Sequence, residues 1–359
     1  MSSTFGKNVT LTVSGRSRGE KLTAILDGIP AGIAVDGELI SRRLSLRRPD
    51  GVLSTSRIEP DGYEITAGVF GGFTDGTPIC ISIGNSDCGD GDQPEYFRPS
   101  HADFTSFVKY GGFADMRGGG FFSGRLTSLL VTAGAIAESV LCGRFPGVSA
   151  ATRIKSVGSV TDPSDVSDRK THGELKNASF PVVSPETAEE MKREILRVKE
   201  EGDSLGGTLE TVILGLPAGV GEPYFDSLES VISHAVFSIP GVKGISFGDG
   251  FALSAMKGSE ANDPILSAEN VLLTASNRAG GINGGISNGM PVVFTTALKP
   301  TPTIALPQTT VSKNDPAKPG SVAFGGRNDP CFAIRAPQAV TAVTELALLD
   351  LLIAGRFIR

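Results

Sequence analysis

The stretch GGGFFSGRLTSLLVTAGAIAESVL, residues 118–141, decides how the rest of the chain is interpreted. From Gly124 to Leu141 most faces of the predicted helix are apolar, which is typical of a helix buried in a core. The three glycines before it let the backbone approach a ligand closely, and the N-terminus of the following helix favours an anion. The segment therefore predicts a core helix that begins beside a ligand-binding loop.

Three further helices are predicted, one before this segment and two after it. Ser184 is a suitable N-cap, Pro185 fits the first helical position, and Gly202 ends a surface helix. A last helix, from about 337 to 354, is aliphatic on one side and is expected to dock on a core or on a partner subunit. Residues 36–48 show a basic amphipathic pattern typical of a helix. Its charges could serve a binding role, but a helix face exposed to solvent would explain them equally well.

Strands are predicted between these helices. Residues 8–13 alternate between apolar and polar, and further strands are expected at 63–70 and 78–83, before an acidic turn at 87–92 that lacks calcium-loop spacing. No internal repeat or low-complexity linker divides the 359 residues. We therefore expect one continuous α+β domain over residues 1–359.

Composition excludes several classes of function. The net charge of -6 argues against general attraction to nucleic acid or to an anionic membrane. The four cysteines show no metal-ligand or disulfide spacing. The N-terminus has no apolar signal region, and Glu138, Glu345 and Asp350 interrupt the apolar segments before about 18 residues. We expect a soluble, unexported, cytoplasmic protein without a metal site.

The histidines offer few candidates for acid-base chemistry. His101 follows Pro99 and precedes Asp103, which is close enough in sequence to orient its imidazole, although such pairs are also common as structural turn contacts. His234 lies in an apolar run and is interpreted as a core or interface residue.

Glycine-rich loops recur along the chain, and none matches a nucleotide-binding fingerprint. Arginines lie beside many of them. In an acidic protein, such local guanidinium groups suit a small ligand that carries carboxylates and phosphate. The arginines concerned are Arg98, Arg117, Arg125, Arg278 and Arg327.

Taken together, the motifs resemble those of the chorismate synthase family. The resemblance runs in order from end to end, and its longest matches are specific. They include SSTFGK (2–7), DGIPAG (27–32), RPSHAD (98–103), SGRLT (123–127), EGDSLGG (201–207), PAGVGEPYFD (217–226), GGINGGISNG (280–289) and KPTPTI (299–304).

The resemblance implies a fold and an activity. The expected fold is an α+β sandwich of helices and antiparallel sheets in one large domain, assembled as a homotetramer. The expected activity is a lyase reaction of the shikimate pathway, the anti-1,4-elimination of phosphate from 5-enolpyruvylshikimate 3-phosphate to give chorismate. It requires reduced FMN without net redox change, with NADPH as a candidate reductant.

The resemblance also implies site residues. Ser17, His101, Ser123 and Asp329 match catalytic positions, with Asp329 expected near flavin N5 as a proton relay. We infer in addition that His101 assists protonation at the leaving side. Arg47 matches a substrate arginine that the family also associates with NADP, and we add Arg125 and Arg335 as substrate-binding residues. The positions expected to contact FMN are Ser123, Pro240, Gly241, Gly284, Lys299, Pro300, Thr301, Pro302, Thr303 and Arg327.

Four positions depart from the family pattern. The family's GESHG loop reads GRSRG at residues 15–19, so Arg18 replaces a catalytic histidine. A guanidinium with a pKa above about 12 donates no proton near neutrality, and loss of a general acid costs about 10²- to 10⁴-fold in rate. Leu53, Phe121 and Asn328 stand where the family usually has cationic residues or histidine.

Three alternatives remain open at this point. Arg18 could stabilise an anionic reduced flavin or the departing phosphate directly by its charge. The chain could instead be an impaired paralogue that binds FMN or a shikimate-type anion without efficient turnover. It could also eliminate phosphate from a smaller anion, since Leu53 and Phe121 remove two cationic positions.

Overall fold

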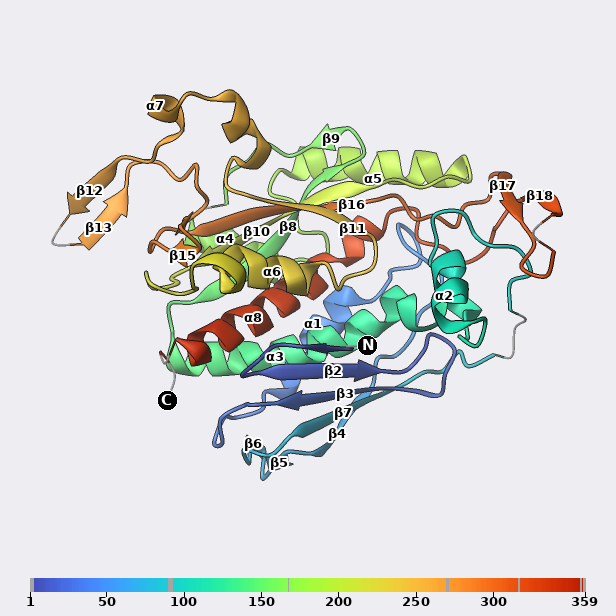
Figure 1. Cartoon of the computed structure of the whole chain (residues 1–359), viewed down its shortest axis with the longest axis horizontal. Helices are drawn as coiled ribbons and strands as arrows, with labels where there is room; N and C mark the ends of the chain where they lie inside the picture. The colour runs from blue at the N-terminus through green and yellow to red at the C-terminus, as the bar shows by residue number, and fades with distance from the viewer. Residues whose placement is uncertain are drawn as a thin grey trace.

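Two five-stranded antiparallel sheets enclose a layer of helices in a single domain (Figure 1). The computed structural model describes residues 3–89, 93–166, 168–268, 271–315, 317–355 and 357. The first sheet has the order β1 (Thr4–Phe5), β2 (Thr10–Ser14), β3 (Lys21–Asp27), β7 (Ile79–Gly84), β4 (Tyr63–Ala67). The second has the order β11 (Val242–Phe247), β16 (Val292–Leu298), β10 (Gly207–Leu214), β8 (Ser149–Val157), β9 (Val160–Thr161).

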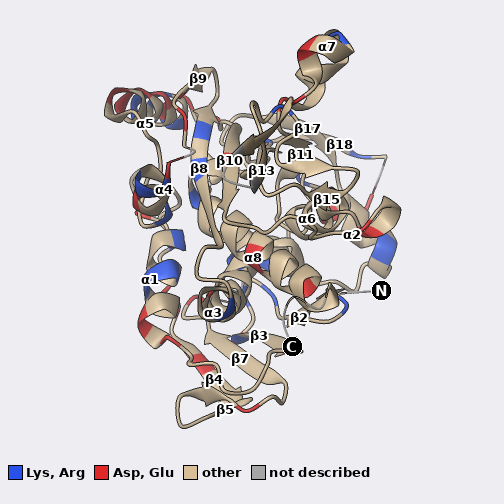
Figure 2. Ribbon diagram, turned by 90° about the vertical axis from the view of Figure 1, so that its left-hand side faces the viewer, with Lys and Arg blue, Asp and Glu red and all other residues tan. Residues whose placement is uncertain are grey.

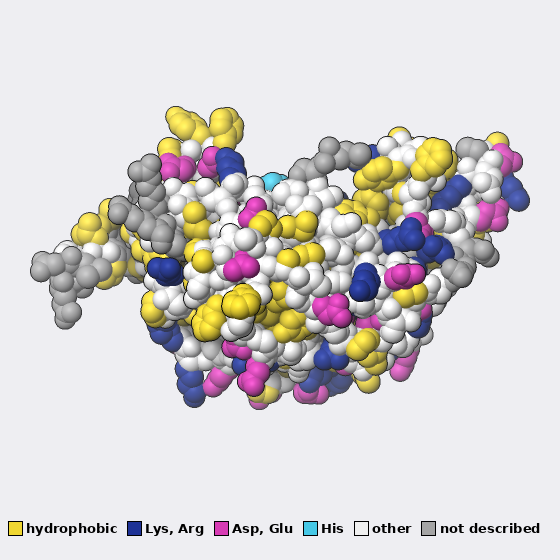
Figure 3. Space-filling model, turned by 90° about the horizontal axis from the view of Figure 1, so that it is seen from below, with side chains coloured by type: hydrophobic (Ala, Val, Ile, Leu, Met, Phe, Trp, Pro, Cys, Tyr) yellow, Lys and Arg dark blue, Asp and Glu magenta, His cyan; other side chains and the backbone are white. Residues whose placement is uncertain are grey.

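The first sheet is buried on one face only. Along β3, Leu22, Ala24 and Leu26 are buried, whereas Lys21 before them and Ile25 between the last two are exposed. Seen from the side of this sheet, the surface mixes hydrophobic, charged and other side chains (Figure 3). This alternation places one face against the helices and leaves the other outside.

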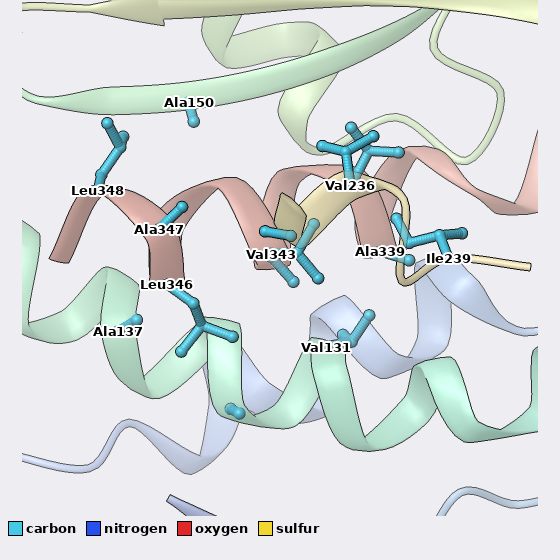
Figure 4. Packing of buried hydrophobic residues seen from close by; sticks show 14 of the residues in the cluster. Val131, Ala137, Ala150, Val236, Ile239, Ala339, Val343, Leu346, Ala347 and Leu348 are labelled. Atoms are coloured by element: carbon cyan, nitrogen blue, oxygen red, sulfur yellow. The ribbon is translucent and has the colours of Figure 1, made fainter. Parts of the chain in front are cut away.

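Helices α3 (Thr127–Arg144) and α8 (Pro337–Ala354) form the centre of the core. They pack against each other, α3 also contacts β3 and β7, and α8 also contacts β8 and β10. Their aliphatic side chains interdigitate with Val236 and Ile239 (Figure 4). A Cβ atom on Gly134 of α3 would lie 2.4 Å from the Cβ of Ala342 in α8, so the close approach of the helices requires this glycine.

The predicted docking of α8 on a core is confirmed, but its contacts are not limited to one side, because the helix is buried between α3 and the second sheet. Its acidic residues are buried with it and have partners. Asp350 accepts hydrogen bonds from the backbone N–H groups of Lys7, Asn8 and Val9 at 2.6–3.2 Å.

The expectation that charges keep the apolar segments too short to span a membrane is wrong. Residues Gly124–Arg144 and Pro337–Ala354 are both long and apolar enough by composition. Within the structure 72% and 89% of these windows are buried, however, as expected of core helices.

The second sheet is covered on both faces. The odd-numbered Leu209 and Ile213 of β10 join the main core, whereas Val212 and Leu214 pack in a smaller cluster with Leu175 of α4 (Arg169–Lys176). Helix α5 (Pro185–Glu200) contacts β8 and β9. Figure 2 shows α1 (Gly37–Arg47), α4 and α5 following one another along one side of the molecule.

Short elements complete the chain. The helical ones are α2 (Asp103–Tyr110), α6 (Leu228–Val236), α7 (Gly258–Ala261) and the 3₁₀ turns η1 (Arg117–Phe122), η2 (Gly124–Leu126), η3 (Tyr224–Asp226), η4 (Gly250–Ala255) and η5 (Phe332–Arg335). The hairpins are β5 (Val69–Phe70) with β6 (Phe73–Thr74), β12 (Ile265–Ala268) with β13 (Val271–Thr274), β14 (Ile282–Asn283) with β15 (Ile286–Ser287), and β17 (Gln308–Val311) with β18 (Pro319–Val322).

Most of the predicted elements are confirmed. Ser184 accepts a hydrogen bond from the N–H of Thr187 as the N-cap of α5, and the four cysteines are free. The predicted core placement of His234 is wrong, because this side chain is exposed on α6, where it contacts the ring of Phe5. Residues 90–92 of the predicted acidic turn lie outside the described residues.

Candidate active site

Three arginine side chains meet where α1 ends and where α3 and α8 begin. Arg47 lies on the last turn of α1, Arg125 in η2 before α3, and Arg335 in η5 before α8. Arg47 Nη2 donates to Asp61 Oδ2 at 2.6 Å, and Arg125 Nη1 donates to the other oxygen of that carboxylate. Arg335 Nη1 donates to Asp329 Oδ2 at 2.7 Å.

This arginine cluster carries more positive than negative charge. Three guanidinium groups share the carboxylates of Asp61 and Asp329, and Arg47 and Asp61 are almost completely buried. Burial lowers the pKa of Arg125 and of Arg335, and the nearby charge of Arg47 lowers both further, although their carboxylate partners act in the opposite direction. An anion placed among these groups would relieve this repulsion.

Two nitrogen atoms of the cluster have no acceptor. Arg47 Nε and Arg335 Nε are both buried, and neither donates a hydrogen bond to any of the described residues. A buried donor left without a partner costs about 1–3 kcal/mol. The cluster is therefore prepared for a ligand that brings acceptor oxygens.

A glycine loop brings Ser17 beside the cluster. Ser17 is fully buried, and its backbone N–H donates to Gly120 O at 3.0 Å. Gly118 and Gly120 have positive φ, and a Cβ on Gly120 would lie 2.1 Å from the carbonyl oxygen of Asp115. Only glycine fits this path of the backbone.

Asp87 joins three cationic side chains on the open side of the site. Its carboxylate pairs with Arg18 Nη1, with Arg327 Nη2 at 2.5 Å and with Arg57 Nε at 3.5 Å. Arg57 Nη1 also donates to Ser17 Oγ at 2.6 Å. The substituted residue Arg18 is thus part of the same charged network as the matched serine.

His101 is oriented by a buried carboxylate. Its Nδ1 lies 3.1 Å from Asp103 Oδ1, and Arg98 holds both oxygens of Asp103 at 2.7 Å. Burial opposes the ionisation of Asp103, but the hydrogen bonds from Arg98 and His101 outweigh it and hold its pKa well below the ordinary range. The ionised carboxylate can only accept, so Nδ1 carries the proton and Nε2 is left for chemistry.

The free edge of His101 faces the glycine loop. A Cβ on Gly119 would lie 3.5 Å from both His101 Nε2 and the Cβ of Ser123. Lys299 Nζ donates to the carbonyl oxygen of Ser100 at 2.5 Å, and Ser100 has a φ of 57°. Lys299 therefore supports the strained residue that precedes His101.

The residues expected to contact a flavin lie around the same loop, with one exception. Lys299 N donates to Gly241 O at 2.9 Å, and Gly241 and Gly124 flank the ring of Phe332. Thr301 Oγ1 is buried without a hydrogen-bond partner among the described residues. Phe332 thus links Gly241 to Gly124, the residue that follows Ser123. Thr301 O accepts from Ser204 Oγ, Pro302 O accepts from Gln308 Nε2, and Arg327 pairs with Asp87.

Gly284 is the exception. It lies in the turn between β14 and β15, at the end of the molecule away from the beginning of α3 (Figure 1). A Cβ at this glycine would meet nothing within 4 Å. No contact in the described ranges joins Gly284 to the other predicted site residues.

Asp329 is held firmly from two sides. Thr55 N donates to Oδ1 at 2.9 Å, and Arg335 donates to Oδ2. Thr55 Oγ1 in turn donates to Arg327 O at 2.7 Å. The segment between α1 and β4, which contains Thr55, therefore fixes Asp329 beside the arginine cluster.

The other departures from the family pattern have different surroundings. Leu53 is partly buried and packs against the main core, Phe121 is exposed next to Phe122, and Asn328 Nδ2 donates to Phe324 O at 3.2 Å. None of these three contributes a charge.

Sequence reasoning missed Arg57, Asp61 and Asp87, which organise the site. Arg57 and Asp61 belong to the segment RIEPD at 57–61, in which one positive and two negative residues lie at every second position. That pattern was a signal of an ion-pair network. Within the described residues no group of three His, Cys, Asp or Glu side chains could hold a metal ion.

Comparisons with known proteins agree along nearly the whole chain. A family model described as chorismate synthase matches residues 9–353. The chorismate synthase of Dehalococcoides mccartyi is 41% identical over 362 residues, which covers 98% of this chain and 96% of that protein. The one from Aeropyrum pernix is 39% identical over 355 residues, covering 97% and 92%. A solved structure described as the crystal structure of chorismate synthase matches with a TM-score of 0.77 at 28% identity, covering 97% of this chain and 93% of that chain.

Proposed function

Because the chain belongs to the chorismate synthase family of lyases, we propose that it catalyses the anti-1,4-elimination of phosphate from 5-enolpyruvylshikimate 3-phosphate. One C–H and one C–O bond of the substrate break, a proton and phosphate leave, and the ring gains a double bond. The product is chorismate, so the reaction belongs to aromatic amino-acid biosynthesis.

The arginine cluster is the observation that carries this proposal. The substrate has two carboxylates and a phosphate, and Arg47, Arg125 and Arg335 offer a net positive charge with two unsatisfied buried donors. Bidentate guanidinium groups suit carboxylate and phosphate oxygens. The negative charge that moves onto the departing phosphate would be stabilised by groups already in place.

His101 and Asp329 are the proposed proton-handling residues. With Nδ1 committed to Asp103, His101 can donate or accept only through Nε2, on the side of Gly119 and Ser123. Both oxygens of Asp329 accept hydrogen bonds, so this carboxylate is fixed in position. We infer that His101 protonates the leaving side and that Asp329 relays the proton taken from the substrate ring.

The residues present fit reduced FMN. The orphaned hydroxyl of Thr301 and the glycines beside Phe332 favour a planar group with polar edges in this segment. When bound, reduced FMN would supply electron density for the elimination without net oxidation. Burial and the charge of Lys243 lower the pKa of Lys299, and an anionic group beside Lys299 would relieve that repulsion.

Arg18 is proposed to act by charge rather than by proton donation. Its ion pair with Asp87 lies beside Ser17 and Arg57, at the position where the GESHG motif that this loop resembles has a histidine. A guanidinium there can stabilise the departing phosphate or an anionic flavin at any pH near neutrality. The impaired-paralogue alternative receives no support from the relatives named above, each of which carries the name of the enzyme.

The test is an anaerobic assay of phosphate release with reduced FMN and 5-enolpyruvylshikimate 3-phosphate. We expect turnover by the natural protein. In Arg18→His the charge titrates, so the rate should fall as pH rises through about 6.5. The matched control is Arg16→His, whose parent side chain lies in the same loop and pairs with Asp115, and it should keep the natural pH profile.

Two results would refute the proposal. No turnover by the natural protein together with turnover by Arg18→His would identify an impaired enzyme. Turnover by both with identical pH profiles would show that the charge at position 18 has no part in the reaction.

We also propose a cytoplasmic homotetramer with NADPH as candidate reductant. The displaced Gly284 supports assembly, because a flavin contact at this position would have to come from a second copy. Exposed aromatic side chains, among them Phe113, Phe225 and Phe251, offer apolar surface for such contacts. Light scattering of the purified protein measures the assembly directly.

A further inference from the structure

A cavity lies between α1, α5 and the segment that follows α1. Its volume is about 680 Å³, within the range of about 300–1,000 Å³ that is common for small-molecule sites. Figure 2 shows α1 and α5 on the same side of the molecule, with α4 between them. Ser179 and Phe180, shortly after α4, also line the cavity.

This cavity adjoins the candidate active site. It shares Arg335 with the arginine cluster and includes Leu53, but Ser17, His101, Ser123 and Asp329 do not line it. The motifs that resemble the family do not include its residues on α5. The cavity therefore requires an explanation of its own.

The cationic side chains in its lining exceed the carboxylates available to them. Lys192 is held by Glu189 at 2.7 Å, and Arg335 is held by Asp329. The carboxylate of Asp50 accepts from the N–H groups of residues 52–54 and from Ser54 Oγ. Arg48 and Arg193 form no ion pair with any of the described residues, so the cavity presents two guanidinium groups without counter-ions.

The remaining wall is apolar and partly exposed. Val52, Ile58 and Leu196 line the cavity with much of their surface uncovered. The ring of Phe180 lies there too, with Lys192 Nζ 5.3 Å from its centroid. Apolar surface next to unpaired guanidinium groups matches a ligand with an anionic head and an apolar body.

We propose that this cavity binds a small organic anion with a ring-sized apolar body, and that an aromatic carboxylate is the matching class. Arg48 and Arg193 hold the carboxylate, and the wall formed by Ile58, Phe180 and Leu196 covers the ring. Because Arg335 belongs to both sites, the ligand would lie directly behind the arginine cluster.

The absence of tryptophan from the chain gives a direct test. Leu196→Trp places a single selective fluorophore in the cavity wall, and Phe70→Trp places one on the exposed hairpin formed by β5 and β6. The probe is 4-nitrobenzoate, an aromatic carboxylate that quenches tryptophan at short range. We expect saturable quenching in Leu196→Trp and only weak, linear quenching in Phe70→Trp.

Matched variants assign the binding to the two arginines. In the Leu196→Trp background, Arg48→Gln with Arg193→Gln should weaken binding at least about tenfold, as removal of charge-assisted hydrogen bonds does. The control, Arg42→Gln with Arg197→Gln, removes the same number of charges from exposed positions on α1 and α5. It should change the affinity for 4-nitrobenzoate little. Neutral 4-nitrobenzyl alcohol should not reach saturation.

The proposal is overturned if quenching is linear in both tryptophan variants, if the alcohol binds as well as the carboxylate, or if the two double variants bind alike. Thermal melting checks that the variants are folded. Should the double variant fail to fold, the single variants Arg48→Gln and Arg193→Gln decide the question by the same titration.

Discussion

Helix α1 carries two buried arginines one turn apart, and their surroundings differ in a way that separates structure from function. Arg43 meets Glu138, Glu345 and Lys176, so two cations face two carboxylates. Its nitrogens Nε, Nη1 and Nη2 all donate hydrogen bonds, including those to Gln338. Arg47 belongs to the arginine cluster, in which three cations face two carboxylates and two Nε atoms lack acceptors.

The pKa directions of the cationic groups follow this balance, whereas burial raises the pKa of Glu345. Burial lowers the pKa of Arg43 and of Lys176, but Glu345 and Glu138 raise both by a greater amount, so both pKa values are raised. The pKa values of Arg125 and Arg335 are lowered instead. A buried cluster whose positive and negative side chains balance holds helices together. A buried cluster with excess positive charge is prepared to bind an anion.

The largest expected effect is on stability, from Arg43→Met. The change leaves the buried carboxylates of Glu138 and Glu345 with Lys176 alone, and breaking a buried pair in this way costs about 3–5 kcal/mol. The free energy of unfolding from urea titration measures it. The control is Arg197→Met, which breaks an exposed pair with Glu194 on α5 and should change little. Equal losses in the two variants would contradict a structural role for Arg43.

The second effect is on activity, from Arg47→Gln. Asp61 keeps Arg125 as its partner, so the free energy of unfolding should fall less than in Arg43→Met. The kcat/KM for 5-enolpyruvylshikimate 3-phosphate should fall about 10²- to 10³-fold, the usual effect of removing one preorganised donor. Arg42→Gln, on the exposed face of the same helix, is the control. Unchanged kcat/KM with a large loss of stability would place Arg47 with Arg43 instead.

A smaller effect is expected where α3 and α8 approach each other, one turn before Glu138. Gly134→Ala adds a methyl group that would lie 2.4 Å from Ala342, and overpacking of this kind costs about 1–3 kcal/mol. Gly143→Ala is the matched control in α3, because its Cβ would meet nothing within 4 Å, and it should stabilise the helix by up to about 1 kcal/mol. If Gly134→Ala is neutral, the close approach does not hold the Arg43 network in place.

The sequence predicted the helices well because their signals are local. The cap at Ser184 and the prolines at 185 and 337 lie next to the helix ends that they determine. The complete burial of α8 was not predictable in the same way, since it results from contacts with β8, which lies far away in the sequence. Glu345 and Asp350 were interpreted only as charges that interrupt an apolar segment, because the partners of both come from distant segments.

The site was predictable only as a set of motifs. The RPSHAD motif contains both His101 and the carboxylate that orients it, so this pair could be inferred from the sequence. The contacts of Arg57 with Ser17 and of Asp61 with Arg125 join segments that are 40 and 64 residues apart. The importance of Arg57 and Asp61 follows from the balance of positive and negative charges in the whole site. Several segments contribute these charges, so no single segment reveals the balance.

The smallest effect is a pH dependence at the edge of the arginine cluster. Burial raises the pKa of Glu59, but hydrogen bonds from Ser86 and Arg57 and the charge of Arg125 lower it more, from an ordinary 4.5 to about 2. A lowered pKa stabilises the fold fully above the unfolded value, and this stabilisation is lost as pH falls through the folded value. The difference in melting temperature between the natural protein and Glu59→Gln should be constant above about pH 4.5 and shrink toward pH 2.

Glu64→Gln is the control for this titration, because Glu64 is an exposed residue of the neighbouring strand β4. Its melting temperature should follow that of the natural protein at every pH. If the Glu59→Gln difference does not change between pH 4.5 and 2, the hydrogen bonds from Ser86 and Arg57 and the charge of Arg125 do not together hold the pKa of Glu59 below its ordinary value.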